Sequence, residues 1–265
     1  MNESLFEQIQ ISAKYLNLDF CAREMAQWSH DKELGDGQLQ AIADVLSFIK
    51  DKKSENIVTT LLRMSRLPLK DPKTFANFDF NQLHGKQTDP LKNLPSLTAL
   101  YAHKNLAFIG PQGVGKTHLA MSYGRECCVK GMRTYFLKAT ELNQKLTDAR
   151  KYGRESSTIT AFIKPSCLII DEVGRCIFNK ENTRMFFDII DRRYNKEGPN
   201  TMIFTSNMSP DKWGEFFDED SSLLCALDRI FDDATVFIIK GNSYRGRKCE
   251  TIALSAGEPS VLPKN

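Results

Sequence analysis

Short runs of apolar residues alternate with longer amphipathic stretches along the chain from Asn105 onward. The runs have the length and composition of buried parallel strands, and they cover residues 105–109, 135–137, 167–171, 201–205 and 235–239. The clearest helical pattern between them spans residues 182–196. This alternation predicts an α/β fold, a five-stranded parallel sheet flanked by helices, with ligand chemistry at the carboxyl ends of the strands.

The first 70 residues follow a different pattern. Helically spaced apolar residues run from Leu5 to Leu18, and a second series runs from Leu39 to Met64. The glycines of Gly35-Asp36-Gly37 separate the two series. Residues 1–70 are therefore predicted to form a small helical domain that binds a partner or DNA.

The remaining boundaries follow from prolines and polar composition. Residues 71–104 are predicted to hold a linker and a leading helix, and within them the polar stretch 82–95 is expected to be a surface loop. Residues 105–249 are predicted to form the α/β domain. The tail 250–265, with glycine, proline and serine, is expected to be flexible.

A glycine-rich motif stands between the first predicted strand and the helix after it. It fits the phosphate-binding pattern G-x-x-x-x-G-K-[ST], and its residues with the one that follows are Gly110, Pro111, Gln112, Gly113, Val114, Gly115, Lys116, Thr117 and His118. Backbone N–H groups of such a loop surround phosphate oxygens at the positive end of a helix. We expect Lys116 to reach the β- and γ-phosphates of ATP, and Thr117 to place its hydroxyl on Mg²⁺.

Two acids end the third predicted strand. Asp171 follows a run of buried apolar residues, and a carboxylate there can hold the Mg²⁺ that bridges the phosphates. Glu172 follows directly and can orient and polarise an attacking water. Two acids after a strand are common, but their place downstream of a phosphate-binding loop favours this catalytic role.

Three further polar residues are candidates for contact with the γ-phosphate. Asn207 follows the fourth predicted strand, where an amide can position the water, although asparagine is also common in turns. A guanidinium can stabilise the charge that spreads over the transferred phosphoryl group, and Arg229 and Arg245 are the candidates. From chemistry alone, either arginine could equally be a surface ion-pair partner.

Composition excludes some classes of protein. No apolar run approaches the ~20 residues needed to span a bilayer, so no membrane association is expected. The first residues lack the basic and apolar regions of a secretory signal. Seven cysteines without metal-ligand spacing indicate free thiols in a reducing compartment, so we expect a cytoplasmic protein. The net charge of +3 is too small to establish nucleic-acid binding by itself.

Taken together, these motifs resemble the IstB family of AAA+ ATPases, helper proteins of insertion-sequence transposition that are related to the DnaC and DnaI helicase loaders. The resemblance covers roughly residues 75 to 248. Its segments are 108–120, 168–174, 191–194, 205–207, 211–217, 227–229 and 240–245. The order of the Trp-Gly-Glu run, Asp-Arg and Ser-Tyr-Arg is the most specific part.

The resemblance implies an AAA+ core with a short or missing lid and gives roles to three residues. Asn207 matches the sensor 1 position, and Arg245 matches the sensor 2 arginine, which acts in its own subunit. Arg229 matches the arginine finger, which acts on the ATP of a neighbouring subunit. Hydrolysis would then depend on a homo-oligomer, a ring or an open helix.

The resemblance also implies DNA contact by an extra helix between the second and third strands. The basic residues of that region are Lys145, Arg150, Lys151 and Arg154. Their contacts to phosphate would be largely independent of sequence, although a charged solvated helix is the alternative. The leading hypothesis is an ATP-dependent, DNA-binding regulator of DNA transposition that recruits or activates a transposase. The alternatives are a replicative helicase loader and an adaptor that binds ATP and hydrolyses little.

Overall fold

The computed structural model describes residues 4–80, 89–217, 222–241 and 243. Its centre is a sheet of five parallel strands in the order β2-β3-β4-β1-β5. The strands are β1 Asn105–Ile109, β2 Thr134–Lys138, β3 Cys167–Val173, β4 Thr201–Ser206 and β5 Ala234–Ile238. The α/β fold and the parallel sheet predicted from the apolar runs are confirmed.

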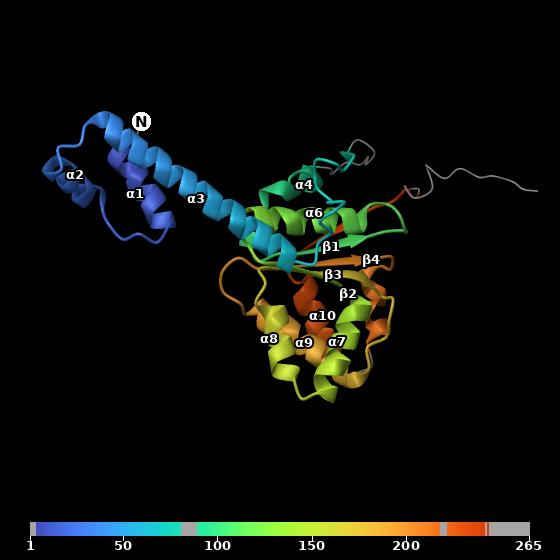
Figure 1. Ribbon diagram of the computed structural model, residues 1–265. Coiled ribbons are helices and arrows are strands. Elements are labelled where there is room, and N and C mark those ends of the chain that lie inside the picture. Colours follow the sequence, from blue (N-terminus) through green and yellow to red (C-terminus); the bar gives the residue numbers. More distant parts are fainter. Residues whose placement is uncertain (1–3, 81–88, 218–221, 242, 244–265) are drawn as a thin grey trace, which may run out of the picture.

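Helices cover both faces of the sheet (Figure 1). One face carries α4 Asp89–Lys92, the 3₁₀ helix η2 Leu94–Ser96, α5 Thr98–Tyr101 and α6 Lys116–Val129. The other face carries α7 Ala139–Lys151, α8 Glu155–Ile163, α9 Lys180–Tyr194 and α10 Ser222–Phe231, with the 3₁₀ helix η3 Pro210–Phe216 beside them. Buried strands alternate their side chains between these two layers, because successive residues of a strand point to opposite faces.

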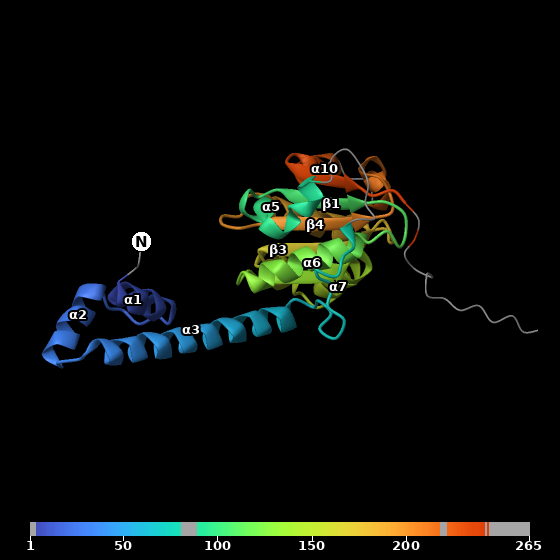
Figure 2. The same ribbon diagram turned by 90° about the horizontal axis from the view of Figure 1, so that it is seen from above.

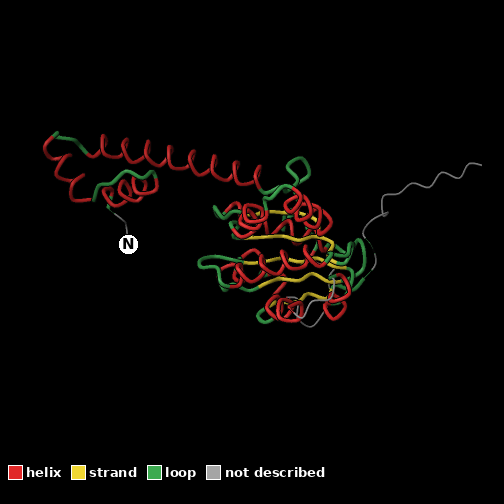
Figure 3. Tube along the Cα trace, turned by 90° about the horizontal axis from the view of Figure 1, so that it is seen from below, coloured by secondary structure: helices red, strands yellow, loops and turns green. Residues whose placement is uncertain are grey.

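The sheet order brings the predicted site residues to one edge. Strand β4 pairs with β1 on one side and with β3 on the other. The segments that follow these three strands therefore leave the sheet next to each other, and Figure 3 shows the strands running alongside one another between loops at their two ends. Parallel strands are joined by crossover connections through helices. These connections let strands that are distant in the sequence, such as β1 and β4, lie side by side.

The N-terminal part consists of α1 Leu5–Tyr15, α2 Ala22–Asp31 and α3 Asp36–Met64. Figure 2 shows α1 and α2 beside the first half of α3, away from the sheet, while the far end of α3 reaches the α/β part. Helix α3 is continuous over 29 residues, so the second apolar series forms a single helix. Gly35 is its N-cap residue, which explains why the glycines mark a boundary.

The prediction of a surface loop over residues 82–95 is wrong for the part that the structure describes. Residues from Asp89 onward form α4 and η2, and Leu91 and Leu94 are buried against the α6 layer. Pro95 stands in the first turn of η2, where its missing N–H is tolerated. Burial of the leucines outweighs the polar composition of the segment. None of the described helices has the length and apolar character needed to cross a membrane.

Candidate nucleotide-binding site

The phosphate-binding motif forms a tight turn between β1 and α6. Gly110 has φ 154°, and a side chain there would place its Cβ 2.0 Å from the carbonyl oxygen of Ile239. Gly115 has φ 95° and precedes the first residue of α6, with the ring of Phe78 directly against it. Both positions therefore require glycine, because any Cβ would be strained and would collide. The loop directs the N-terminus of α6 toward the edge of the sheet.

Lys116 and Asn207 are brought together by this turn. Lys116 is 7 % exposed, and its ammonium donates to Asn207 Oδ1 at 2.7 Å. It also donates to the carbonyl oxygens of Gly110 at 2.7 Å and Pro111 at 2.6 Å. An ammonium has three protons, and these three acceptors can take one each. They hold the charge of Lys116 inside the loop, next to the end of β4. The predicted proximity of the lysine and the asparagine is therefore present in the structure.

The hydroxyl of Thr117 and the carboxylate of Asp171 also meet. Thr117 Oγ1 donates to Asp171 Oδ1 at 2.7 Å, and Asp171 is 2 % exposed. Thr205 Oγ1, in the neighbouring strand β4, donates to the same carboxylate oxygen at 2.5 Å. The Glu172 backbone N–H donates to Thr205 Oγ1 at 3.0 Å. Thr205 thus positions both acids, a role that sequence reasoning missed even though a threonine inside an apolar strand is a visible signal.

The backbone changes direction between the two acids. Pairing of β3 with β4 shifts register between Ile170 and Val173, and Glu172 has φ 60°. A bulge of this kind turns a side chain away from the strand's regular alternation. The Glu172 carboxylate consequently lies between two cations, 3.3 Å from Lys138 Nζ and 3.5 Å from a guanidinium nitrogen of Arg175. It is 25 % exposed and engaged by these ion pairs.

Most of these residues line a pocket of about 510 Å³. It is lined by Pro68, Asp71, Lys73, Gln112, Gly113, Gly115, Lys116, Thr117, His118, Met121, Glu172, Arg175, Thr205, Ser206 and Asn207. Four residues of the predicted motif and acid pair are not part of this lining, namely Gly110, Pro111, Val114 and Asp171. Val114 and Asp171 are buried behind it, and Val114 contributes packing.

One wall of the pocket comes from residues 68–73, at the junction between the predicted helical domain and the predicted linker. Pro68, Asp71 and Lys73 line the pocket directly. His118 ties this segment to α6, because its Nε2 lies 2.9 Å from the carbonyl oxygen of Thr74 and 2.9 Å from Asn77 Oδ1. Sequence spacing gave no signal for this wall, since it precedes the first strand and carries no motif.

The two candidate arginines have different outcomes. Arg229 is half-exposed on α10 and pairs with Asp191 of α9 at 2.8 Å, and it is absent from the lining of its own chain's pocket. Arg245 lies outside the described residues, although Ser243, two positions earlier, packs against Gly113 of the phosphate loop. Arg229 therefore makes no contribution to the nucleotide pocket of its own chain.

The four basic residues proposed for DNA contact divide into two groups. Lys145, Lys151 and Arg154 are exposed, and Lys151 and Arg154 lie over the ring of Tyr152. Arg150 instead turns inward, donating to Asn182 Oδ1 at 3.1 Å and pairing with Glu181 at 3.4 Å.

Comparison with solved structures places the fold. DnaA from Aquifex aeolicus with bound AMPPCP superimposes with a TM-score of 0.53 at 23% identity, over 64% of this chain and 50% of that chain. DnaI superimposes with a TM-score of 0.50 at 18% identity, over 64% of this chain and 91% of that chain. Identities this low show the fold alone. The fold and the phosphate-binding site together define a P-loop ATPase of the AAA+ class.

Sequence comparison identifies the family. The ATP-binding protein assigned to insertion sequence IS5376 of Geobacillus stearothermophilus is 35% identical over 197 residues, covering 74% of this chain and 76% of that protein. Its counterpart in IS232 of Bacillus thuringiensis subsp. berliner is 33% identical over 250 residues, covering 91% and 94%. The model of the family described as IstB-like ATP binding protein matches residues 11–251, and this chain belongs to that family.

Proposed function

We propose that this chain binds MgATP in the pocket at the carboxyl ends of β1, β3 and β4 and hydrolyses it during DNA transposition. The observation that carries the proposal is the meeting of Lys116 with Asn207 and of Thr117 with Asp171 around one pocket. When the nucleotide binds, Lys116 would give up a hydrogen bond to a loop carbonyl oxygen and donate to a phosphate oxygen instead. Pro68 and Met121 also line the pocket and offer apolar contact to the nucleotide.

The donor atoms near Thr117 fit a magnesium ion. A hydroxyl and a buried carboxylate oxygen stand 2.7 Å apart, and hard oxygen donors are the ligands that Mg²⁺ prefers. Thr117 and Asp171 would hold the ion directly or through water. The ion would neutralise charge on the phosphates, while Thr205 keeps the Asp171 carboxylate oriented.

Hydrolysis would require Glu172 to leave at least one of its two ion pairs. A carboxylate held by Lys138 and Arg175 is poorly placed to orient a water, because its charge is already neutralised. Arg229 of a neighbouring copy would supply the guanidinium for the transition state, after breaking its pair with Asp191. Such a head-to-tail contact is heterologous and generates a ring or an open helix.

The biological role is inferred from the relatives. Several proteins similar to this chain are named as ATP-binding proteins of insertion sequences. We infer an ATP-dependent regulator that assembles on target DNA and recruits or activates a transposase, acting in the cytoplasm where both DNA and ATP are present. The helicase-loader alternative is supported only by the similarity of fold to DnaI, because a sequence identity of 18% is too low to indicate a shared function.

Two variants test the proposal. Arg229→Ala should abolish DNA-stimulated ATP turnover while leaving ATP binding within about twofold of wild type, and Glu172→Gln should retain ATP and DNA in a stable assembly. Turnover is measured by phosphate release, and ATP binding by a fluorescent analogue. The matched control is Arg192→Ala, an exposed arginine paired with Asp188 on α9. Loss of ATP binding in Arg229→Ala would overturn the role of that residue, and unchanged turnover in Glu172→Gln would overturn the role of the glutamate.

A further inference from the structure

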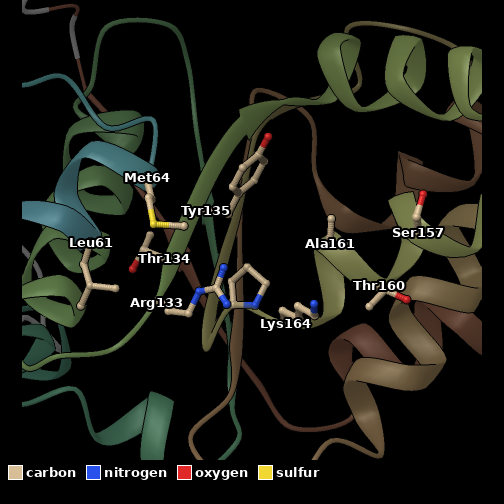
Figure 4. Close-up of a pocket in the computed structure, with 10 residues that line it drawn as sticks. Leu61, Met64, Arg133, Thr134, Tyr135, Ser157, Thr160, Ala161 and Lys164 are labelled. Carbon is tan, nitrogen blue, oxygen red and sulfur yellow. The ribbon is translucent and has the colours of Figure 1, made fainter. Parts of the chain in front are cut away.

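A second pocket lies at the end of the sheet opposite to the nucleotide pocket. It has a volume of about 400 Å³ and is formed where strands β2 and β3 begin, between the last turn of α3 and helix α8. Figure 4 shows Arg133 and Lys164 within it, with Met64 on one side and Ser157 and Thr160 on the other. None of the motifs that define the ATP site contributes to this pocket.

The charge of this pocket is uncompensated. Two cations and several hydroxyl groups line it, and no acidic side chain does. Lys196 adjoins it, donating from Nζ to the carbonyl oxygens of Lys164 at 3.1 Å and Pro165 at 2.8 Å. Within the described part of the chain, Arg133, Lys164 and Lys196 have no acidic partner within ion-pair distance.

A buried guanidinium adds to the positive potential here. Arg193 lies behind the pocket and is bonded only to carbonyl oxygens and to the Asn200 side-chain oxygen, which carry no formal charge. Burial, together with Arg193 and Arg133, lowers the pKa of Lys196 to about 8. These four cations at one end of the sheet favour the binding of an anion.

The pocket forms one end of a longer strip of surface, which consists of this pocket and the hollow next to it. It shares Tyr135, Ser157 and Ala161 with a neighbouring hollow of about 440 Å³ on the α7–α8 side. That hollow is lined by Lys145 and Arg154, and by Tyr152, whose residue is 61 % exposed. The one acid there, Asp148, accepts a hydrogen bond from Gln144.

The shape of this strip selects the class of ligand. Cations repeat along it beside the exposed ring of Tyr152, the half-buried ring of Tyr135 and several hydroxyl groups, whereas a single small anion would need only one cluster. A nucleic-acid backbone presents phosphates at regular intervals, and its sugars and bases can contact aromatic side chains. The strip therefore fits a polyphosphodiester better than an isolated phosphate.

We propose that Arg133 and Lys164 form a second phosphate-contact segment for DNA, continuous with Lys145, Lys151 and Arg154. The backbone would cross α8 from the α7–α8 turn to the last turn of α3. This inference rests on the proposed DNA binding and adds a path and two residues to it. Binding there would be independent of base sequence and sensitive to salt, because the contacts are to phosphate.

The test compares two double variants by fluorescence anisotropy with a labelled DNA duplex at several salt concentrations. Arg133→Gln combined with Lys164→Gln removes two charges from the pocket. Lys180→Gln combined with Lys212→Gln removes two exposed charges from the start of α9 and from η3, and is the matched control.

The pocket variant should reduce the slope of log K against log salt by about 1.8, since each phosphate contact contributes about 0.9 for duplex DNA. Between 50 and 200 mM salt the wild type should therefore lose about tenfold more affinity than the pocket variant. The control variant should keep the wild-type slope. Arg133→Lys combined with Lys164→Arg keeps the charges and should keep the slope, which separates lost contacts from a damaged fold.

The outcomes distinguish this inference from the proposed function. A wild type without measurable DNA binding would overturn the proposed function and the inference with it. Wild-type binding with equal slopes in the pocket and control variants would overturn the inference alone. Loss of binding in the charge-keeping variant would also overturn it, because the charge would then not be the cause.

Discussion

Arg193 joins the end of α8 to the beginnings of β3 and β4, and its replacement is expected to be the most destabilising single change in this part of the fold. The side chain is fully buried. Its guanidinium donates to the carbonyl oxygens of Phe162 at 3.0 Å, Pro165 at 2.8 Å and Thr201 at 2.9 Å, and to Asn200 Oδ1 at 2.7 Å. Burial lowers its pKa to about 10, so the group stays charged at neutral pH.

The expected cost of Arg193→Met follows from this geometry. Hydrogen bonds from a charged donor contribute about 1.5–3 kcal/mol each, so the four short ones together amount to roughly 6–12 kcal/mol. Desolvation of the guanidinium offsets several kcal/mol of that sum. The net loss is about 3–5 kcal/mol, because methionine leaves several buried acceptor oxygens without a donor, at a cost of about 1–3 kcal/mol each. For a chain of this size it corresponds to a fall in Tm of about 6–20 °C.

Urea unfolding followed by far-UV circular dichroism measures the effect. The control is Arg192→Met, one residue away, where an exposed i,i+4 pair with Asp188 is lost at a cost below about 1 kcal/mol. Because Arg193 is charged in the folded and unfolded states below about pH 9, the difference between the two variants should not change from pH 6 to pH 8.5. Equal stability of the two variants would refute the reasoning.

Three further changes test the site and its surroundings. Lys138→Ala should raise ATP turnover without DNA about two- to fivefold, because Glu172 loses one of its two ion-pair partners. Thr205→Val should lower turnover about tenfold and raise the Mg²⁺ concentration needed, because Asp171 loses the hydroxyl that orients it. Burial lowers the pKa of Lys196 to about 8, so the unfolded state binds more protons between pH 8 and 10.5, and wild-type stability relative to Lys196→Met should rise across that range.

Each of these predictions has its own control or contrary result. Lys138→Arg preserves the charge and should leave turnover near wild type, whereas a fall in Lys138→Ala would mean that the lysine supports catalysis. Thr205→Ser keeps the hydroxyl and should behave like wild type, and an equal loss in both variants would point to packing. A pH-independent difference between wild type and Lys196→Met in urea unfolding would contradict the assignment of its pKa.

The sequence predicted the sheet because its strands read as short apolar runs, and β1, β3 and β4 are buried on both faces. The meeting of Thr117 with Asp171 and of Lys116 with Asn207 followed from the motifs, since parallel strands end at one edge. The exact ends differed by a residue or two, as in β3, which continues to Val173 through a bulge. Local pattern was therefore sufficient for the strands and for motif residues that directly follow a strand.

Residues whose role depends on distant partners could not be predicted in the same way. Lys138 is an ordinary last residue of a strand until β2 pairs with β3 and brings it to Glu172. Arg193 lies in a charged helix end and would be assigned to the surface, yet it is fully buried. Pro68 lines the nucleotide pocket only because the chain folds back over α6. Tertiary contacts created these roles, and no spacing in the sequence encodes them.

The most direct test of a nucleotide site shared between two copies is a mixing experiment. Lys116→Ala lacks the phosphate-binding lysine, and Arg229→Ala lacks the arginine offered to the neighbour, so each variant alone should be inactive in DNA-stimulated ATP turnover. In an equal mixture, about a quarter of the sites would combine an intact Lys116 with an intact Arg229 from the adjoining copy, as random head-to-tail assembly requires. Recovery of about a quarter of wild-type turnover is the predicted result. A mixture as inactive as its components would contradict the account.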